Sequence, residues 1–353
     1  MTQRQDWWVY EGTGTPHDGI RRLPPAPPWR AFRHDGTRSA PLYEPSHVPA
    51  DDAAGRRHLG RAWQGAAYQA GEKEIHLVNL ALHLRRPLLL TGKPGTGKST
   101  LAYAVAHELK LGPVLRWSVT SRSTLKDGLY EYDAVGRLYD AGLRNTGVCA
   151  GSVSAAEPPD IGKYLSLGPL GTALLNWPRP RVLLIDEIDK SDMDFPNDLL
   201  NVFEEGEFAI PELARLGDRP QEVVTDDGER AVVRGGEVAC TQFPFVVLTS
   251  NEEREFPMAF LRRCIRLKIG AADPERLAGI VAAHLGAPED VAPELAGART
   301  ELIARFLKRQ REVGVLANDQ LLNALLMAER GLWGSEKGQA LVLDDLLRPL
   351  DGG

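Results

Sequence analysis

The sequence has few cysteines, no long apolar segment and no excess of basic charge. Its three cysteines, Cys149, Cys240 and Cys264, are widely separated in 353 residues. This number and spacing fit neither a disulfide framework nor a cysteine-rich zinc site. No apolar run approaches the roughly 20 residues of a membrane-spanning helix, and the first residues lack the apolar core of a signal peptide. We therefore expect a cytoplasmic protein without a membrane partner.

The charge balance also limits the class of partner. The net charge is −6, with 43% hydrophobic and 25% charged residues. This is an ordinary globular composition without the broad basic surface of a duplex-DNA-binding protein. The length allows one large or two modest domains. We expect nucleic acid to be an unlikely partner.

The N-terminal region, residues 1–60, differs from the rest. It contains the segment RRLPPAPPWRAF and the tryptophans Trp7, Trp8 and Trp29. Pro-Pro segments disfavour helix and sheet and favour extended conformations. One interpretation is a poorly ordered leader. The alternative, which we favour because of the tryptophans, is an arm docked on its own domain or on a neighbouring subunit.

Strand and helix patterns alternate in residues 61–271. The segment 72–84 predicts an amphipathic helix, and the apolar runs that follow are continuous and of strand length. Such runs are typical of buried parallel strands with helical crossovers: 88–90, 114–119, 182–185 and 245–249.

Residues 272–353 show only helical patterns. Start signals occur at Asp273-Pro274 and at Asn318-Asp319. We expect an α/β domain followed by a small helical domain, with helices within 274–285, 301–313, 318–333 and 341–350.

The segment LLLTGKPGTGKSTLA (88–102) contains the pattern Gly92-x-x-x-x-Gly97-Lys98-Ser99. Glycines at this turn let several backbone N–H groups point inward, where the following helix adds its positive end. This predicts a phosphate cradle in which Lys98 reaches the β- and γ-phosphates and Ser99 ligates Mg²⁺. The predicted nucleotide-contacting residues are Gly92, Lys93, Pro94, Gly95, Thr96, Gly97, Lys98, Ser99 and Thr100.

Two acidic residues end the apolar run RVLLIDEIDKS (181–191). Asp186 is expected to hold the Mg²⁺ shell and Glu187 to polarise the attacking water. The alternative is a pair of solvated acids at a strand end. The position favours the first interpretation, because α/β proteins bind ligands at the carboxyl edge of the sheet.

Two further segments supply candidate catalytic side chains. FVVLTSNEE (245–253) ends a strand with Asn251, which is a candidate for orienting the water or sensing the γ-phosphate. AFLRRCIRLKI (259–269) carries Arg262 and Arg263, which are too far along the chain to reach their own phosphates easily. A neighbouring subunit's arginine can stabilise the transition state in trans. Alternatively, Asn251 belongs to a simple turn, and Arg262 and Arg263 are an ordinary pair of surface arginines.

The order of these motifs resembles the AAA+ ATPases, and within them the MoxR-like branch, over about residues 70–350. LLNVFEEGEF (199–208) is similar to the LLEAMQE-type ending of that branch's Walker B region. The resemblance implies a P-loop AAA+ core with a parallel sheet flanked by helices, a helical lid, ATP and Mg²⁺. It also selects Arg263 as the arginine finger, with Arg262 in reserve.

The inserts and the lid carry further expectations. Segment 128–142 is expected to be a hairpin at the helix-2 insert, and segment 222–240 a second hairpin; either could face a pore, or both could be surface hairpins. The usual sensor-2 arginine is missing, and Asn318 or Gln320 occupies its neighbourhood. Sensor 2 is therefore absent or replaced.

Three functions remain open at this point. The first is a ring-shaped remodelling motor or chaperone, expected to be a hexamer, with a protein client and often a von Willebrand factor A-type partner. The second is a nucleic-acid-linked NTPase of restriction or helicase type. The third is a slow nucleotide-gated switch, which the missing sensor-2 arginine would allow.

Overall fold

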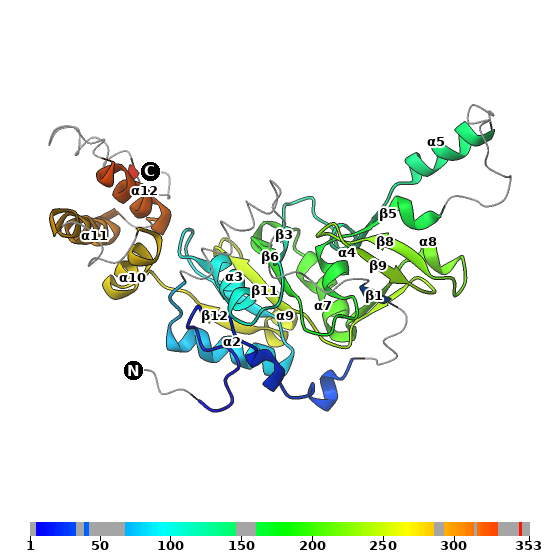
Figure 1. Ribbon diagram of the computed structural model, residues 1–353, viewed down its shortest axis with the longest axis horizontal. Helices are drawn as coiled ribbons and strands as arrows, with labels where there is room; N and C mark the ends of the chain where they lie inside the picture. The colour runs from blue at the N-terminus through cyan, green and yellow to red at the C-terminus, as the bar shows by residue number, and fades with distance from the viewer. Residues whose placement is uncertain are drawn as a thin grey trace.

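A five-stranded parallel sheet forms the centre of the protein (Figure 1). The structure is a computed structural model, and the description covers residues 5–32, 39–41, 68–145, 160–285, 293–313, 316–330 and 346–347. The strand order is β12-β2-β11-β6-β3. These strands are β2 (Leu88–Thr91), β3 (Leu115–Ser118), β6 (Val182–Asp186), β11 (Phe245–Ser250) and β12 (Ile265–Lys268). All four expected strands are confirmed.

Both faces of this sheet are buried, which explains the continuous apolar runs. Leu88 and Leu90 of β2 pack on one face with the helices α2 (Glu72–Leu84) and α3 (Lys98–Glu108). Leu89 points to the opposite face. That face is covered by three helices: α6 (Pro169–Ala173), α7 (Phe195–Glu205) and α9 (Met258–Arg263). The expected helix at 72–84 and the α/β class are confirmed.

A second five-stranded sheet lies beside the parallel one, in the order β1-β9-β8-β5-β4. The expected hairpin within 222–240 is confirmed, because β8 and β9 pair antiparallel about a turn at Asp226–Gly228. The strands are β1 (Ser39–Pro41), β4 (Tyr130–Tyr132), β5 (Leu165–Leu167), β8 (Gln221–Val224) and β9 (Arg230–Val233). A separate pair joins β7 (Glu207–Ala209) to β10 (Glu237–Ala239), and the connecting helices are α4 (Leu125–Leu129) and α8 (Pro211–Ala214).

The hairpin expected at 128–142 is wrong. Tyr130–Tyr132 is the strand β4, but the residues after it form the helix α5 (Ala134–Asn145), which extends away from the body (Figure 1). Three of its apolar side chains are exposed: Val135, Leu138 and Tyr139. Their spacing of three and four residues places them on one helix face, and this spacing has greater weight than the apparent Val-Gly turn.

The described part of the N-terminal arm is docked on its own α/β domain, which is the alternative that its tryptophans favoured. Trp8, Val9 and Tyr10 are buried against α2 and α3. The side chain of Asn79 accepts hydrogen bonds from the amides of Val9 (2.7 Å) and Tyr10 (3.0 Å) and donates one to the carbonyl of Tyr10 (2.7 Å). Trp29, by contrast, is exposed.

A buried carboxylate fixes the next part of the arm. Glu108, at the last position of α3, accepts hydrogen bonds from the amides of Glu11 (2.6 Å), Gly12 (3.0 Å) and Gly14 (2.9 Å). The arm therefore binds the end of α3 that lies opposite Lys98. Residues 33–38 and 42–60 lie outside the described part.

Among the described residues after the parallel sheet, three helices pack around their own apolar cluster. They are α10 (Pro274–Leu285), α11 (Pro293–Val313) and α12 (Asn318–Glu329). The two start signals are confirmed. The helix expected at 341–350 lies outside the described residues, apart from 346–347. Within the described chain, no helix has the length and apolarity that a bilayer crossing requires.

Candidate nucleotide-binding site

The glycine-rich turn between β2 and α3 adopts a conformation that depends on glycine. Gly92, Gly95 and Gly97 have φ angles of 148°, 73° and 86°, a region that L side chains rarely adopt. A Cβ atom on Gly92 would lie 2.3 Å from the carbonyl oxygen of Ile269. The turn ends at Gly97, the N-cap of α3, so the unpaired N–H groups of that helix face the loop.

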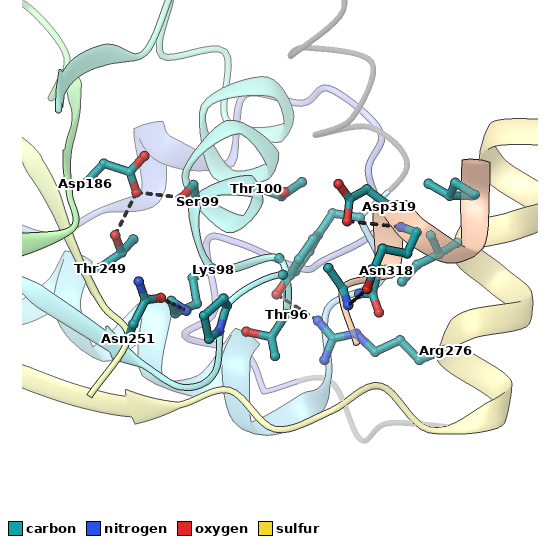
Figure 2. A pocket seen from close by; sticks show the side chains of 18 of the residues that line it. Thr96, Lys98, Ser99, Thr100, Asp186, Thr249, Asn251, Arg276, Asn318 and Asp319 are labelled. Carbon is teal, nitrogen blue, oxygen red and sulfur yellow. Dashed lines mark hydrogen bonds between the residues drawn. The ribbon is translucent and has the colours of Figure 1, made fainter. Parts of the chain in front are cut away.

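Lys98 lies beneath this turn and is held by three oxygen atoms. Its Nζ donates to the carbonyls of Gly92 and Lys93 and to Oδ1 of Asn251, each at 2.8 Å (Figure 2). Burial lowers the pKa of Lys98, and the charges of Asp189 and Asp186 oppose this effect. The amine is thus oriented under the loop, next to the predicted water-orienting asparagine.

Asp186 is the acceptor of a small network at the end of β6. Its Oδ1 accepts from the hydroxyls of Ser99 and Thr249, both at 2.7 Å (Figure 2), and its Oδ2 pairs with Arg116 at 2.6 Å. Burial alone would raise the pKa of Asp186, but hydrogen bonds from Thr249, Ser99 and Arg116 outweigh it and lower the pKa. The carboxylate is therefore ionised, as a Mg²⁺ ligand must be.

The predicted Mg²⁺ donors fit the ion chemically. Asp186 and Ser99 bring a carboxylate and a hydroxyl oxygen together at the start of α3, and hard divalent cations prefer such oxygen donors. Bound Mg²⁺ would supply charge neutralisation to the phosphates.

Glu187 follows Asp186 in a left-handed conformation, with φ of 62°. Thr249 accepts a hydrogen bond from the Glu187 amide at 2.9 Å, so one hydroxyl fixes both members of the acidic pair. The Glu187 carboxylate is 45% exposed and pairs with Lys190 at 2.7 Å. It lies in the wall of the cavity described below.

Asp189 connects this turn to the end of β11. Its Oδ2 accepts from the amide of Asn251 (2.7 Å), the hydroxyl of Ser250 (3.1 Å) and the amide of Glu253 (3.3 Å). Asp189 is buried. It therefore fixes the backbone that carries the Asn251 side chain.

These side chains surround a cavity of about 520 Å³ between the glycine-rich turn and the C-terminal helices (Figure 2). The amide of Asn318 donates to the carbonyl of Gly95 at 3.2 Å, so α12 begins directly against the turn. The lining includes the phosphate-cradle segment 94–100, Asp186, Glu187, Thr249 and Asn251. Gly92 and Lys93 are not in the lining, but their carbonyls hold Lys98.

The C-terminal helices bring Asn318 and Gln320 to the cavity, at the position where the sensor-2 arginine was missing. They also bring Arg276, from the first turn of α10. Its guanidinium donates to Glu74 (2.7 Å) and to the hydroxyl of Tyr68 (2.8 Å), which joins α10 to α2 and to the segment before it.

Arg262 and Arg263 do not line this cavity. Arg263 donates through Nε to Glu204 (3.0 Å) and through Nη1 to the carbonyl of Ala259 (3.2 Å). The Arg262 carbonyl accepts from Arg86 at 3.4 Å. A role of either arginine at a neighbouring subunit's nucleotide stays a prediction.

Several residues at the site were not singled out from the sequence as site residues. Thr249 and Asp189 belong to the segments 245–253 and 181–191. A polar side chain at or just after the end of a buried strand is a signal that could have identified them. Arg116, Tyr68, Glu74 and Arg276 had none, because their partners lie far along the chain.

A strand, a glycine-rich phosphate loop and a helix, with two acids at the end of the parallel strand β6, define a P-loop nucleotide-binding protein. Residues 87–264, just over half of the chain, match the model of the AAA domain, dynein-related subfamily, and the chain belongs to this family. Members generally hydrolyse ATP, usually with Mg²⁺, and commonly form rings. A search of curated proteins finds no match.

Proposed function

We propose that the protein is an ATP-hydrolysing remodelling motor of MoxR-like type, acting as a hexameric ring with ATP at the subunit interfaces. The main support is the convergence of Lys98, Ser99, Asp186, Glu187 and Asn251 on one cavity. These side chains lie at the end of β6, directly after β6 and β11, and at the start of the helix that follows β2; the three strands are parallel and end at the same edge of the sheet.

Each side chain has a defined role in this proposal. The backbone amides of the glycine-rich turn and Lys98 bind the β- and γ-phosphates. Glu187 polarises the attacking water and accepts its proton. Asn251, held between Lys98 and Asp189, orients that water. Arg263 of the neighbouring subunit stabilises the charge of the transition state.

The partners follow from the resemblance to the MoxR-like branch. We propose a protein client and a von Willebrand factor A-type partner protein, with nucleic acid unlikely. The exposed apolar face of α5 supports a protein rather than a polyanion as the contacted molecule. A gel shift at low and high salt tests the alternative, because phosphate contacts give a steep salt dependence.

The test of the site is the ATPase rate of Lys98→Ala and Glu187→Gln. We expect a loss of at least about 10²-fold in each, the lower range for a positioned acid–base group. Lys73→Ala and Glu229→Gln are matched controls, because both side chains are exposed and lie outside the cavity. Hydrolysis that persists in both site variants contradicts the assignment. Slow wild-type turnover with nucleotide-dependent partner binding would indicate the switch instead.

A further inference from the structure

The N-terminal arm places a buried arginine next to the predicted arginine finger. Arg30, in the short 3₁₀ helix Pro28–Arg30, is only 6% exposed. Its Nη1 donates to Oε2 of Glu204 at 3.0 Å, and its Nη2 donates to the carbonyl of Arg85 at 2.7 Å. Its guanidinium lies 5.3 Å and 5.2 Å from the ring centroids of Phe32 and Phe243. Arg30 is therefore held on several sides.

Glu204 is shared between two arginines. While Oε2 accepts from Arg30, Oε1 accepts from Nε of Arg263 at 3.0 Å. Arg263 is also fixed by the bond from Nη1 to the Ala259 carbonyl. Its remaining nitrogen, Nη2, has no hydrogen-bond partner within the described part of the chain.

We infer that Arg30 and Glu204 are positioning residues for the Arg263 finger, so that the N-terminal arm takes part in hydrolysis at the neighbouring subunit's nucleotide. This inference rests on the proposed trans role of Arg263. Glu204 and Arg263 lie within the residues matched by the family model, whereas Arg30 comes from the arm outside that match.

The physical reason is the mobility of a free arginine side chain. Arg263 is 44% exposed, and a long exposed side chain populates many rotamers, of which a finger uses few. The Glu204 carboxylate and the Ala259 carbonyl hold two of its nitrogens and leave Nη2 to reach across the interface. Arg30 fixes the Glu204 carboxylate from the opposite side.

The test uses mixed rings in which one subunit donates the finger and the other supplies the nucleotide site. Glu187→Gln subunits cannot hydrolyse but keep Arg263, and Arg263→Ala subunits keep the site but lack the finger. Each variant alone is expected to be inactive, and their mixture is expected to recover ATPase activity. No recovery would contradict the trans role itself, and thus the proposed function.

Glu204→Gln is then added to one subunit at a time. On the donor, Glu187→Gln, we expect it to lower the recovered rate about fivefold, the upper range for an exposed ion pair. On the acceptor, Arg263→Ala, we expect no change, which also shows that Glu204→Gln folds. Arg30→Gln should likewise lower the recovered rate on the donor and leave it unchanged on the acceptor. Arg30→Lys, which retains the charge, should recover part of the rate.

Three results would overturn the positioning role while the parent mixture stays active. An equal loss on donor and acceptor would indicate a merely structural role. No loss on either would show that the contacts are incidental. A higher rate with the altered donor would show that Glu204 withholds Arg263 rather than presenting it.

Discussion

Replacing Asp189 by asparagine tests how the site holds its water-orienting residue. Asp189 does not need to touch nucleotide to matter, because its Oδ2 accepts three hydrogen bonds from residues 250–253. Asparagine has almost the same shape and keeps one acceptor oxygen. The change therefore removes the charge and leaves the packing nearly intact.

The magnitude follows from those bonds. A hydrogen bond to a charged group contributes about 1.5–3 kcal/mol, against about 0.5–1.5 kcal/mol for a neutral pair. Two of the three bonds, from Asn251 and Ser250, are no longer than 3.1 Å. We therefore expect Asp189→Asn to lower the free energy of unfolding by about 2 kcal/mol.

The same substitution should change the pH dependence of hydrolysis. Burial lowers the pKa of Lys98, and Asp189 is the first of the charges that raise it. Without that charge the pKa of Lys98 falls further. Because the amine binds phosphate in its protonated form, activity is lost as pH rises through this pKa. The alkaline limb of the rate profile should therefore move to lower pH.

The assay combines urea unfolding with kcat measured across pH. The matched control is Asp192→Asn, an exposed neighbour whose carboxylate accepts a 3.3 Å bond from the Asp194 amide, and we expect a change within about 0.5 kcal/mol. The reasoning is refuted if Asp189→Asn matches the wild type in stability and in the alkaline limb, or if Asp192→Asn shows the same losses.

Three other predictions concern the arm, the cysteines and the C-terminal helices. Asn79→Ala leaves buried arm amides without an acceptor, so we expect a loss of about 2–4 kcal/mol in unfolding free energy and faster proteolysis of the arm; an arm that stays equally resistant would contradict this. Burial raises the pKa of both Cys240 and Cys264 to about 12, so native protein at pH 8 should resist iodoacetamide at both positions until denatured, as mass spectrometry would show. Arg276→Ala should raise the KM for ATP several-fold, because it cuts the link from α10 to α2; an unchanged KM would count against that link.

Much of the fold followed from local patterns in the sequence. The helix at 72–84 and the buried strands were predictable because their apolar spacing reflects burial directly. Helix α5 was not, because Gly136 and Gly142 weaken a helical interpretation and its apolar residues have no core to face. The apolar spacing 135, 138, 139 was the better guide.

The site also has a part that the sequence predicts and a part that it does not. Lys98, Ser99, Asp186 and Glu187 belong to short motifs, so their meeting at one sheet edge could be predicted from strand polarity. The contacts that position the site join distant segments. Arg276 and Glu74 are 202 residues apart, and Arg30 and Glu204 are 174 apart. No local pattern links such pairs, and only the folded chain brings them together.

The most direct test of shared sites is the ATPase rate per subunit against protein concentration, with Arg263→Ala mixed into the wild type in increasing proportion. We predict that the rate per wild-type subunit rises with concentration and falls as the variant is added, because each hydrolytic site then loses its neighbour's arginine. A rate that stays flat with concentration and is indifferent to the variant would mean hydrolysis by single subunits. That result would contradict the ring with Arg263 acting in trans.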